Sequence, residues 1–150
     1  MTEHCSTFEK VHYDSLKARQ KELFNFQKIA ATLADYGFNC IKLADDWLGA
    51  DFLAYHMNGE TTLKVQLKSR LTIDQKYCGK DIWVAFPHKR CWYLIKHDCL
   101  VDKVGKQTRW LDSPSWKDNH VFHSESINVG LLKSLEEDKL GEVCGTVLAT

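Results

Sequence analysis

The chain has 150 residues, of which 44% are apolar and 27% charged, and its 20 basic residues balance its 20 acidic ones. This composition is typical of one globular domain that buries its own core, and it excludes a low-complexity chain. No apolar run approaches the roughly 18 residues of a membrane span, and the polar N-terminus lacks a secretory signal core. The sequence therefore predicts a single cytoplasmic domain over 1–150, with a core at about 14–140 and a loosely held tail at 141–150.

The charges are unevenly distributed along the chain. Residues 64–109 hold eleven Lys or Arg against four Asp or Glu, whereas the segments on either side are acidic. A basic block of this kind is compatible with a footprint on a phosphate backbone, and also with an ordinary solvated surface. Within the block, Lys64 and Lys80 are candidates for contacts with DNA.

The cysteines and histidines give little sign of metal or disulfide chemistry. Six cysteines are an even number, which invites a disulfide framework, but no Cys-x-x-Cys pair occurs. Several of them lie within apolar runs, so we expect reduced and mostly buried thiols. His120 and His123 have no second ligand pair at the spacing of a zinc finger, so zinc is not expected.

The first predicted elements are a helix, a strand and a loop. Residues 14–36 show the periodicity of an amphipathic helix, with Asp14 or Ser15 as its cap. A short apolar strand over 38–43 and a polar loop over 44–49 follow.

Asn58-Gly59 predicts a β-hairpin with a two-residue type I′ turn. In that register the numbers of paired residues sum to 117, so Asp51 lies directly across from Gln66 on the same face. Lys68 lies two residues further along that face. A three-residue loop would shift the register by one and break the pairing.

The remaining elements are two aromatic-rich strands and a second helix. Residues 81–88 and 91–101 are predicted as strands around a turn, 102–126 as a polar stretch with a short strand at 108–111, and 127–140 as an amphipathic helix. The order of helix, three strands, two strands and helix predicts a small α/β sandwich.

Asp51, Gln66 and Lys68 form the candidate site. Hydrolysis of a phosphodiester at neutral pH needs a divalent cation and a cationic group beside the attacking water. Mg²⁺ prefers oxygen ligands, here the carboxylate of Asp51 and either the amide oxygen of Gln66 or the backbone carbonyl of Leu67. Lys68 would orient or polarise the water. The alternative interpretation is the polar face that any amphipathic strand shows.

Glu22 is a candidate third acidic group. It stands at the head of the apolar stripe of the predicted helix, four residues before Phe26. A carboxylate directed towards a sheet is costly unless it is paired or bound to a metal. The alternative is an edge residue that reaches water from the first turns.

The order of a helix, a strand, "GAD" opening the next strand and "VQLKSR" on the following one resembles the PD-(D/E)XK nuclease superfamily. Restriction endonucleases, Holliday-junction resolvases and many repair nucleases have this fold. The resemblance implies an α/β, restriction-endonuclease-like αβββαβ-type core, with a mixed central sheet flanked by helices. Asp51 matches the family's metal-binding aspartate, residues 66–68 match its (Asp/Glu)-X-Lys element, and Glu22 matches its helix carboxylate.

The resemblance also implies substrate contacts and an activity. "LKSR" is similar to the segment found in resolvase-like members, which makes Ser69 and Arg70 candidate DNA contacts. The implied activity is a Mg²⁺-dependent DNA endonuclease of restriction, homing or resolvase type, with Mn²⁺ as an alternative metal. The implied partners are DNA and further copies of the chain in a homodimer or higher oligomer, in a prokaryotic or phage setting.

Two positions depart from the family pattern. Ala50 stands where the motif has proline, and Gln66 replaces an acidic residue. Some active members, among them an intron-encoded homing endonuclease, are similar in using Gln there. Because Gln66 is neutral, a non-catalytic nucleic-acid-binding or assembly module on the same fold stays open, and so does a protein-interaction domain that binds no nucleic acid.

Overall fold

The computed structural model describes residues 7–47 and 49–142. Six strands form a central sheet in the order β1-β2-β3-β5-β6-β8, and β4 pairs with β7 in a second, two-stranded sheet. The strands are β1 (Phe38–Trp47), β2 (Ala50–His56), β3 (Thr62–Leu67), β4 (Leu71–Asp74), β5 (Ile82–His88), β6 (Cys91–Lys96), β7 (Val121–Ser124) and β8 (Lys139–Glu142). The helices are α1 (Ala18–Ala34), α2 (His97–Gln107), α3 (Pro114–Lys117) and α4 (Val129–Ser134). Within the described ranges, no helix combines the length and apolarity needed to cross a membrane.

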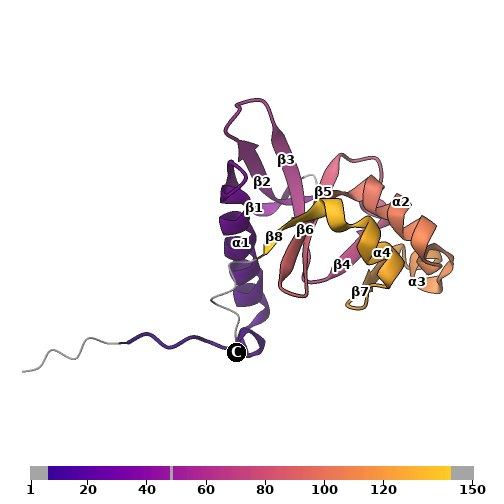
Figure 1. Ribbon diagram of the computed structural model, residues 1–150, viewed down its shortest axis with the longest axis horizontal. Helices are drawn as coiled ribbons and strands as arrows, with labels where there is room; N and C mark the ends of the chain where they lie inside the picture. The colour runs from indigo at the N-terminus through magenta and orange to yellow at the C-terminus, as the bar shows by residue number, and fades with distance from the viewer. Residues whose placement is uncertain (1–6, 48, 143–150) are drawn as a thin grey trace, which may run out of the picture.

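Helices cover both faces of the central sheet (Figure 1). On one face, Ile29 and Leu33 of α1 are buried against Phe52 and Val65 of the hairpin strands. On the opposite face, α2, α4 and β4 bury a second core with side chains of β5 and β6. Strands β3 and β5 run parallel, while the other neighbouring strands of this sheet run antiparallel. The predicted mixed sheet flanked by helices is confirmed.

The predicted helix and first strand differ from the structure at their ends. Helix α1 begins at Ala18, because Tyr13–Ser15 forms a separate 3₁₀ turn and Lys17 takes the N-cap position. Strand β1 continues to Trp47, so the loop predicted over 44–49 is largely strand. Its register against β2 shifts between Lys42 and Trp47, which shows that the extension is irregular.

The register of the β2–β3 hairpin is the predicted one. Phe52 pairs with Val65 and Ala54 pairs with Leu63, so paired residue numbers sum to 117. Alternating apolar residues on the face towards α1 fix this register, because a shift by one residue would expose all of them.

The hairpin turn is not the predicted two-residue turn. The N–H of His56 donates to the carbonyl of Thr61 at 2.9 Å, which leaves a four-residue loop over 57–60. Gly59 has a positive φ of 74° but Asn58 does not, and a type I′ turn requires both. The Asn58 side chain instead accepts hydrogen bonds from the N–H groups of Glu60 and Thr61. Two- and four-residue loops with the same centre give the same strand pairing, so the register is unaffected.

The connection from β3 to β5 differs from an αβββαβ-type core. Within the described chain it contains β4 and a 3₁₀ turn at Gln75–Tyr77, and no α-helix. Strand β4 leaves the central sheet to pair with β7, whose register places Ile73 opposite Phe122. This pair of short strands covers the part of the central sheet that a crossover helix would otherwise cover.

The C-terminal third departs most from the sequence prediction. The strand predicted over 91–101 ends at Lys96, and α2 begins at His97. The strand predicted at 108–111 is wrong because Trp110–Asp112 is a 3₁₀ turn. The helix predicted over 127–140 is confined to α4 and is followed by β8. Gly141 and Glu142, the first two residues of the predicted tail, belong to β8, and 143–150 lie outside the described residues.

The cysteines are less buried than predicted. Of the four in the described ranges, Cys91 is buried and Cys40 half-buried, whereas Cys78 and Cys99 are exposed, and all four are free thiols. Cys78 directly follows the 3₁₀ turn at Gln75–Tyr77, and Cys99 lies in α2. The sequence prediction included neither element. Burial raises the pKa of the Cys40 thiol to about 11, so this thiol is a poor nucleophile.

Candidate functional site

The paired strands β2 and β3 bring Asp51 and Gln66 together. Asp51 Oδ2 accepts a hydrogen bond from the backbone N–H of Leu67 at 2.7 Å, which fixes the carboxylate against the neighbouring strand. Continuing the register beyond Phe52–Val65 places Gln66 opposite Asp51. The two residues predicted to share one face of the hairpin do share it.

Gln66 is buried without full hydrogen bonding. Gln66 is one of the few polar residues that are buried, with only 6% of its surface exposed. Its Oε1 atom has no hydrogen-bond partner within the described parts of the chain. Burying an unpaired amide oxygen costs roughly 1–3 kcal/mol. A polar oxygen held at such a cost beside a carboxylate is the arrangement expected of a ligand-binding group.

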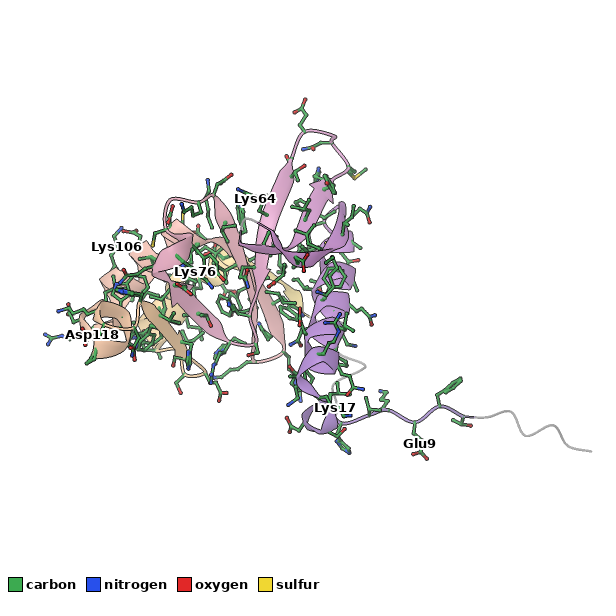
Figure 2. The ribbon with its side chains drawn as sticks, turned by 180° about the vertical axis from the view of Figure 1, so that it is seen from behind. Glu9, Lys17, Lys64, Lys76, Lys106 and Asp118 are labelled. Atoms are coloured by element: carbon green, nitrogen blue, oxygen red, sulfur yellow. The ribbon has the colours of Figure 1, made fainter. Side chains whose placement is uncertain are left out.

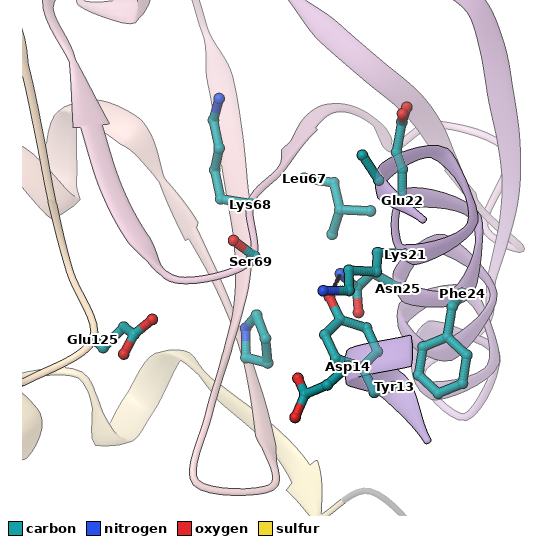
Figure 3. Close-up of a pocket in the computed structure, with 12 residues that line it drawn as sticks. Tyr13, Asp14, Lys21, Glu22, Phe24, Asn25, Leu67, Lys68, Ser69 and Glu125 are labelled. Carbon is teal, nitrogen blue, oxygen red and sulfur yellow. Dashed lines mark hydrogen bonds between the residues drawn. The ribbon is translucent and has the colours of Figure 1, made fainter. Parts of the chain in front are cut away.

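Lys68 and Glu22 line one cavity of about 690 Å³ between α1 and the end of β3 (Figure 3). Glu22 projects from α1 and forms an ion pair with Lys42 of β1 at 3.1 Å, with its side chain 52% exposed. The predicted helix carboxylate therefore faces the cavity that holds Lys68, but it is already paired and reaches water. Its exposure agrees with the alternative of an edge residue that reaches water, and its role as a site group stays a prediction.

The position of Lys68 is set by its backbone and by an aromatic ring. Its N–H donates to the carbonyl of Ala85 on β5 at 2.9 Å, which extends the β3–β5 pairing. Its Nζ lies 5.6 Å from the centre of the Tyr77 ring, and Tyr77 is almost fully buried. A cation is attracted to the face of an aromatic ring, so this contact orients the ammonium group. This contact could not be predicted from the sequence, because Tyr77 lies in a turn of the β3–β5 connection.

The four predicted DNA contacts fall into two groups. Ser69 is exposed at the cavity, and Arg70 next to it forms a long ion pair of 3.6 Å with Glu125. Lys64 and Lys80 lie together elsewhere, because Lys64 Nζ donates to the backbone carbonyl of Lys80 at 3.2 Å.

The basic block over 64–109 does not form one cationic surface. Figure 2 shows Lys64, Lys76 and Lys106 spread from the hairpin to α2. At least five of its eleven basic residues form ion pairs within the described chain: Arg70, Lys76, Lys96, Lys103 and Lys106. The charge pattern of the sequence therefore overstates the cationic surface near the candidate site.

A second cluster, which the sequence prediction missed, consists of Cys78, His97 and Asp98. His97 is fully buried, and its Nε2 accepts a hydrogen bond from the N–H of Asp74 at 3.0 Å. Burial lowers the pKa of His97, although Asp98 and Asp74 partly offset this effect. A neutral imidazole whose Nε2 is an acceptor carries its proton on Nδ1, the atom that faces Asp98 at 3.8 Å. A protonated Nδ1 cannot ligate a metal, so we do not assign a metal site here.

Comparison with known proteins gives one structural similarity. No protein-family model matches the chain, and no curated protein matches its sequence. Among solved structures, the chain is similar to the bacterial homing endonuclease I-Ssp6803I, with a TM-score of 0.45, 14% sequence identity, and coverage of 75% of this chain and 78% of that one. A similarity of this size says nothing by itself about activity.

Proposed function

We propose that this chain is a metal-dependent endonuclease that hydrolyses phosphodiester bonds in DNA. The observation that carries the proposal is the buried Oε1 of Gln66, which has no hydrogen-bond partner among the described residues and lies opposite the carboxylate of Asp51. The match of Asp51, Gln66, Lys68 and Glu22 to the PD-(D/E)XK pattern supports it, as does the order α1-β1-β2-β3.

The donor atoms suit Mg²⁺ because all of them are oxygens. Asp51 would supply a carboxylate held in place by the Leu67 N–H, Gln66 its amide oxygen, Leu67 its backbone carbonyl, and Glu22 a second carboxylate. When bound, the ion would act as a Lewis acid that neutralises charge on the phosphate. Because Gln66 is neutral, we expect weaker metal binding than with an acid at this position.

Lys68 would act on the attacking water and on the charge of the phosphate. Its backbone is fixed to β5 and its ammonium group is held over Tyr77, beside the cavity. A preorganised cation at this place orients a water molecule and stabilises negative charge as it develops in the transition state. For Glu22 to take part, its ion pair with Lys42 would have to open.

Cutting both strands of a duplex requires two active sites. We therefore propose a homodimer or a higher homo-oligomer for double-strand cleavage. A single chain would suffice for nicking.

The test is cleavage of supercoiled plasmid with Mg²⁺ or Mn²⁺. We expect nicking or linearisation that is lost on chelation and in Asp51→Asn and Lys68→Ala, and retained in Lys106→Ala, which changes an exposed lysine on α2. DNA retardation on a gel without cleavage, unchanged by chelation or by Lys68→Ala, would instead favour the non-catalytic binding module on this fold. Cleavage that survives both site substitutions would contradict the proposed site.

A further inference from the structure

The α1 side of the cavity carries a polar cluster that the proposed reaction does not use. Asn25 Nδ2 donates a hydrogen bond to the hydroxyl of Tyr13 at 2.9 Å, and Lys21 Nζ lies 5.3 Å from the centre of the Tyr13 ring. All three residues line the cavity. Figure 3 shows them with Asp14 on the side of α1, and Lys68 with Ser69 on the side of the strand.

The fold holds this cluster in place before any ligand binds. Lys21 and Asn25 are four residues apart, so they project from the same side of α1. The Tyr13 ring packs against Phe24, with 5.4 Å between ring centres, and this contact fixes the 3₁₀ turn against the helix. The ammonium, amide and phenol groups therefore converge on one end of a cavity whose other end holds Lys68.

We infer that this cluster is a nucleotide subsite, in which Lys21 contacts the phosphate next to the scissile one and Asn25 with Tyr13 contacts the attached sugar or base. An ammonium group neutralises a phosphate, and a side-chain amide can both donate to and accept from a base edge. The cavity volume of about 690 Å³ lies within the range of small-molecule pockets, about 300–1,000 Å³, and admits a nucleotide unit. The subsite rests on the proposed function, since it places the substrate strand beside Lys68.

The charges around the cavity allow a phosphate there. Its lining contains two lysines, Lys21 and Lys68, and three carboxylates, those of Asp14, Glu22 and Glu125. Two of the three carboxylates are matched by cations from outside the lining, because Lys42 pairs with Glu22 and Arg70 with Glu125. Asp14 remains on the α1 side, where Lys21 supplies the positive charge that a phosphate would meet.

The test is DNA affinity as a function of salt concentration, measured by fluorescence anisotropy in EDTA with a short labelled duplex. Lys28→Ala is the matched control, because Lys28 lies on the same helix over the Phe24 ring at 5.2 Å but does not line the cavity. Loss of one phosphate contact lowers the slope of log affinity against log salt by about 0.9, so the ratio of the Kd values for Lys21→Ala and wild type should change about 3.5-fold between 50 and 200 mM salt. We expect this for Lys21→Ala and no change of slope for Lys28→Ala.

Asn25→Ala separates the uncharged contact from the charged one. It should raise the Kd several-fold while leaving the salt slope unchanged, whereas Gln27→Ala, an exposed position on the same helix, should do neither. Thermal melting of each variant checks that α1 remains folded.

The outcome for the subsite can be told apart from the outcome for the nuclease by measuring plasmid cleavage with the same proteins. If cleavage depends on Asp51 but Lys21→Ala and Asn25→Ala bind DNA like their controls, the subsite is overturned and the nuclease stands. If Lys21→Ala lowers the salt slope but no metal supports cleavage, the subsite stands as a DNA contact and the nuclease is overturned. If wild type does not bind DNA even at low salt, both are overturned.

Discussion

The carboxylate of Asp51 accepts a hydrogen bond from the backbone N–H of Leu67 at 2.7 Å, across the β2–β3 pair. This bond ties the acidic residue to the strand segment that carries Gln66 and Lys68. All three candidate site residues therefore depend on one hairpin register, and the carboxylate has a structural role as well as the proposed chemical one.

Substitutions at Asp51 should separate these two roles. Asp51→Asn keeps an oxygen that can accept from the Leu67 N–H, so the free energy of unfolding should stay within about 1 kcal/mol of wild type while cleavage is lost. Asp51→Ala leaves that N–H without its partner and should cost about 1–3 kcal/mol in addition. Urea unfolding followed beside the plasmid assay measures both. Equal destabilisation by the two variants would show that the hydrogen bond contributes little.

Gln66→Met should stabilise the protein and abolish cleavage. The substitution replaces a buried amide, whose oxygen has no partner in the described chain, by an apolar group of similar length. We expect the free energy of unfolding to rise by about 1 kcal/mol, because the desolvation penalty of the orphan oxygen disappears. A stability gain combined with lost cleavage is the signature of a residue kept for function. A clear loss of stability would show that Gln66 is an ordinary structural amide.

Gln66→Glu should lower the Mg²⁺ concentration needed for half-maximal cleavage. A carboxylate adds a negative charge to the proposed donor set, and affinity for hard cations rises with the charge of their ligands. The comparison is a Mg²⁺ titration of the initial rate for wild type and variant. An increased Mg²⁺ requirement would contradict the placement of this side chain among the metal ligands.

Lys103 should matter far more for stability than its neighbour Lys106. Its Nζ donates to Glu137, Asp138 and the backbone carbonyl of Ser134, at 2.7–2.8 Å, and joins α2 to the segment after α4. Lys103→Met leaves the mostly buried Asp138 carboxylate without this partner, and should cost about 2 kcal/mol. Lys106→Met removes only an exposed pair with Asp102, and should cost about 0.5 kcal/mol or less. Denaturant unfolding of the two variants makes the comparison, and similar costs would contradict it.

Acid should weaken the fold through His97. Burial lowers the pKa of this imidazole in the folded state, whereas the unfolded chain has the ordinary histidine pKa of about 6.5. Below that pH the unfolded state takes up a proton that the folded state does not, so stability falls as pH falls, by up to about 1.4 kcal/mol per pH unit. In His97→Gln, whose amide oxygen can still accept from the Asp74 N–H, this loss is absent. The stability advantage of wild type over His97→Gln should therefore shrink from pH 7.5 to pH 5.5, and a difference independent of pH would contradict the account.

The hairpin and its facing residues could be predicted because two independent signals agreed. Asn58-Gly59 marked the turn, and the apolar residues Phe52, Ala54, Leu63 and Val65 permit only one register. The turn type was wrong, since the Asn58 side chain stabilises a longer loop, but the centre of the loop was right. The position of the loop centre alone determines that Asp51 lies across from Gln66 in the hairpin.

The rest of the site depends on contacts between distant segments, which periodicity does not reveal. Strand β4 is only four residues long and pairs with β7 about fifty residues later, so neither strand shows a pattern of its own. The apolar run that begins at Cys91 ends at Ile95, and the apolar residues that resume at Cys99 belong to α2; short apolar runs do not distinguish strand from helix. The contact of Lys68 with Tyr77, and the cavity shared by Lys68 and α1, arise from these same connections.

The most direct test of the metal site is a Mn²⁺ titration of the ¹⁵N-labelled protein followed by NMR, because paramagnetic broadening locates even weak binding and needs no knowledge of the DNA target. We expect the amide signals of Asp51, Leu67 and Lys68 to broaden first. We expect Gln66→Met and Asp51→Asn to abolish this broadening and Lys106→Met to leave it unchanged. Broadening centred instead on Cys78 and Asp98 or on the acidic residues 136–138, or the same pattern in Gln66→Met as in wild type, would contradict a metal site built from Asp51 and Gln66.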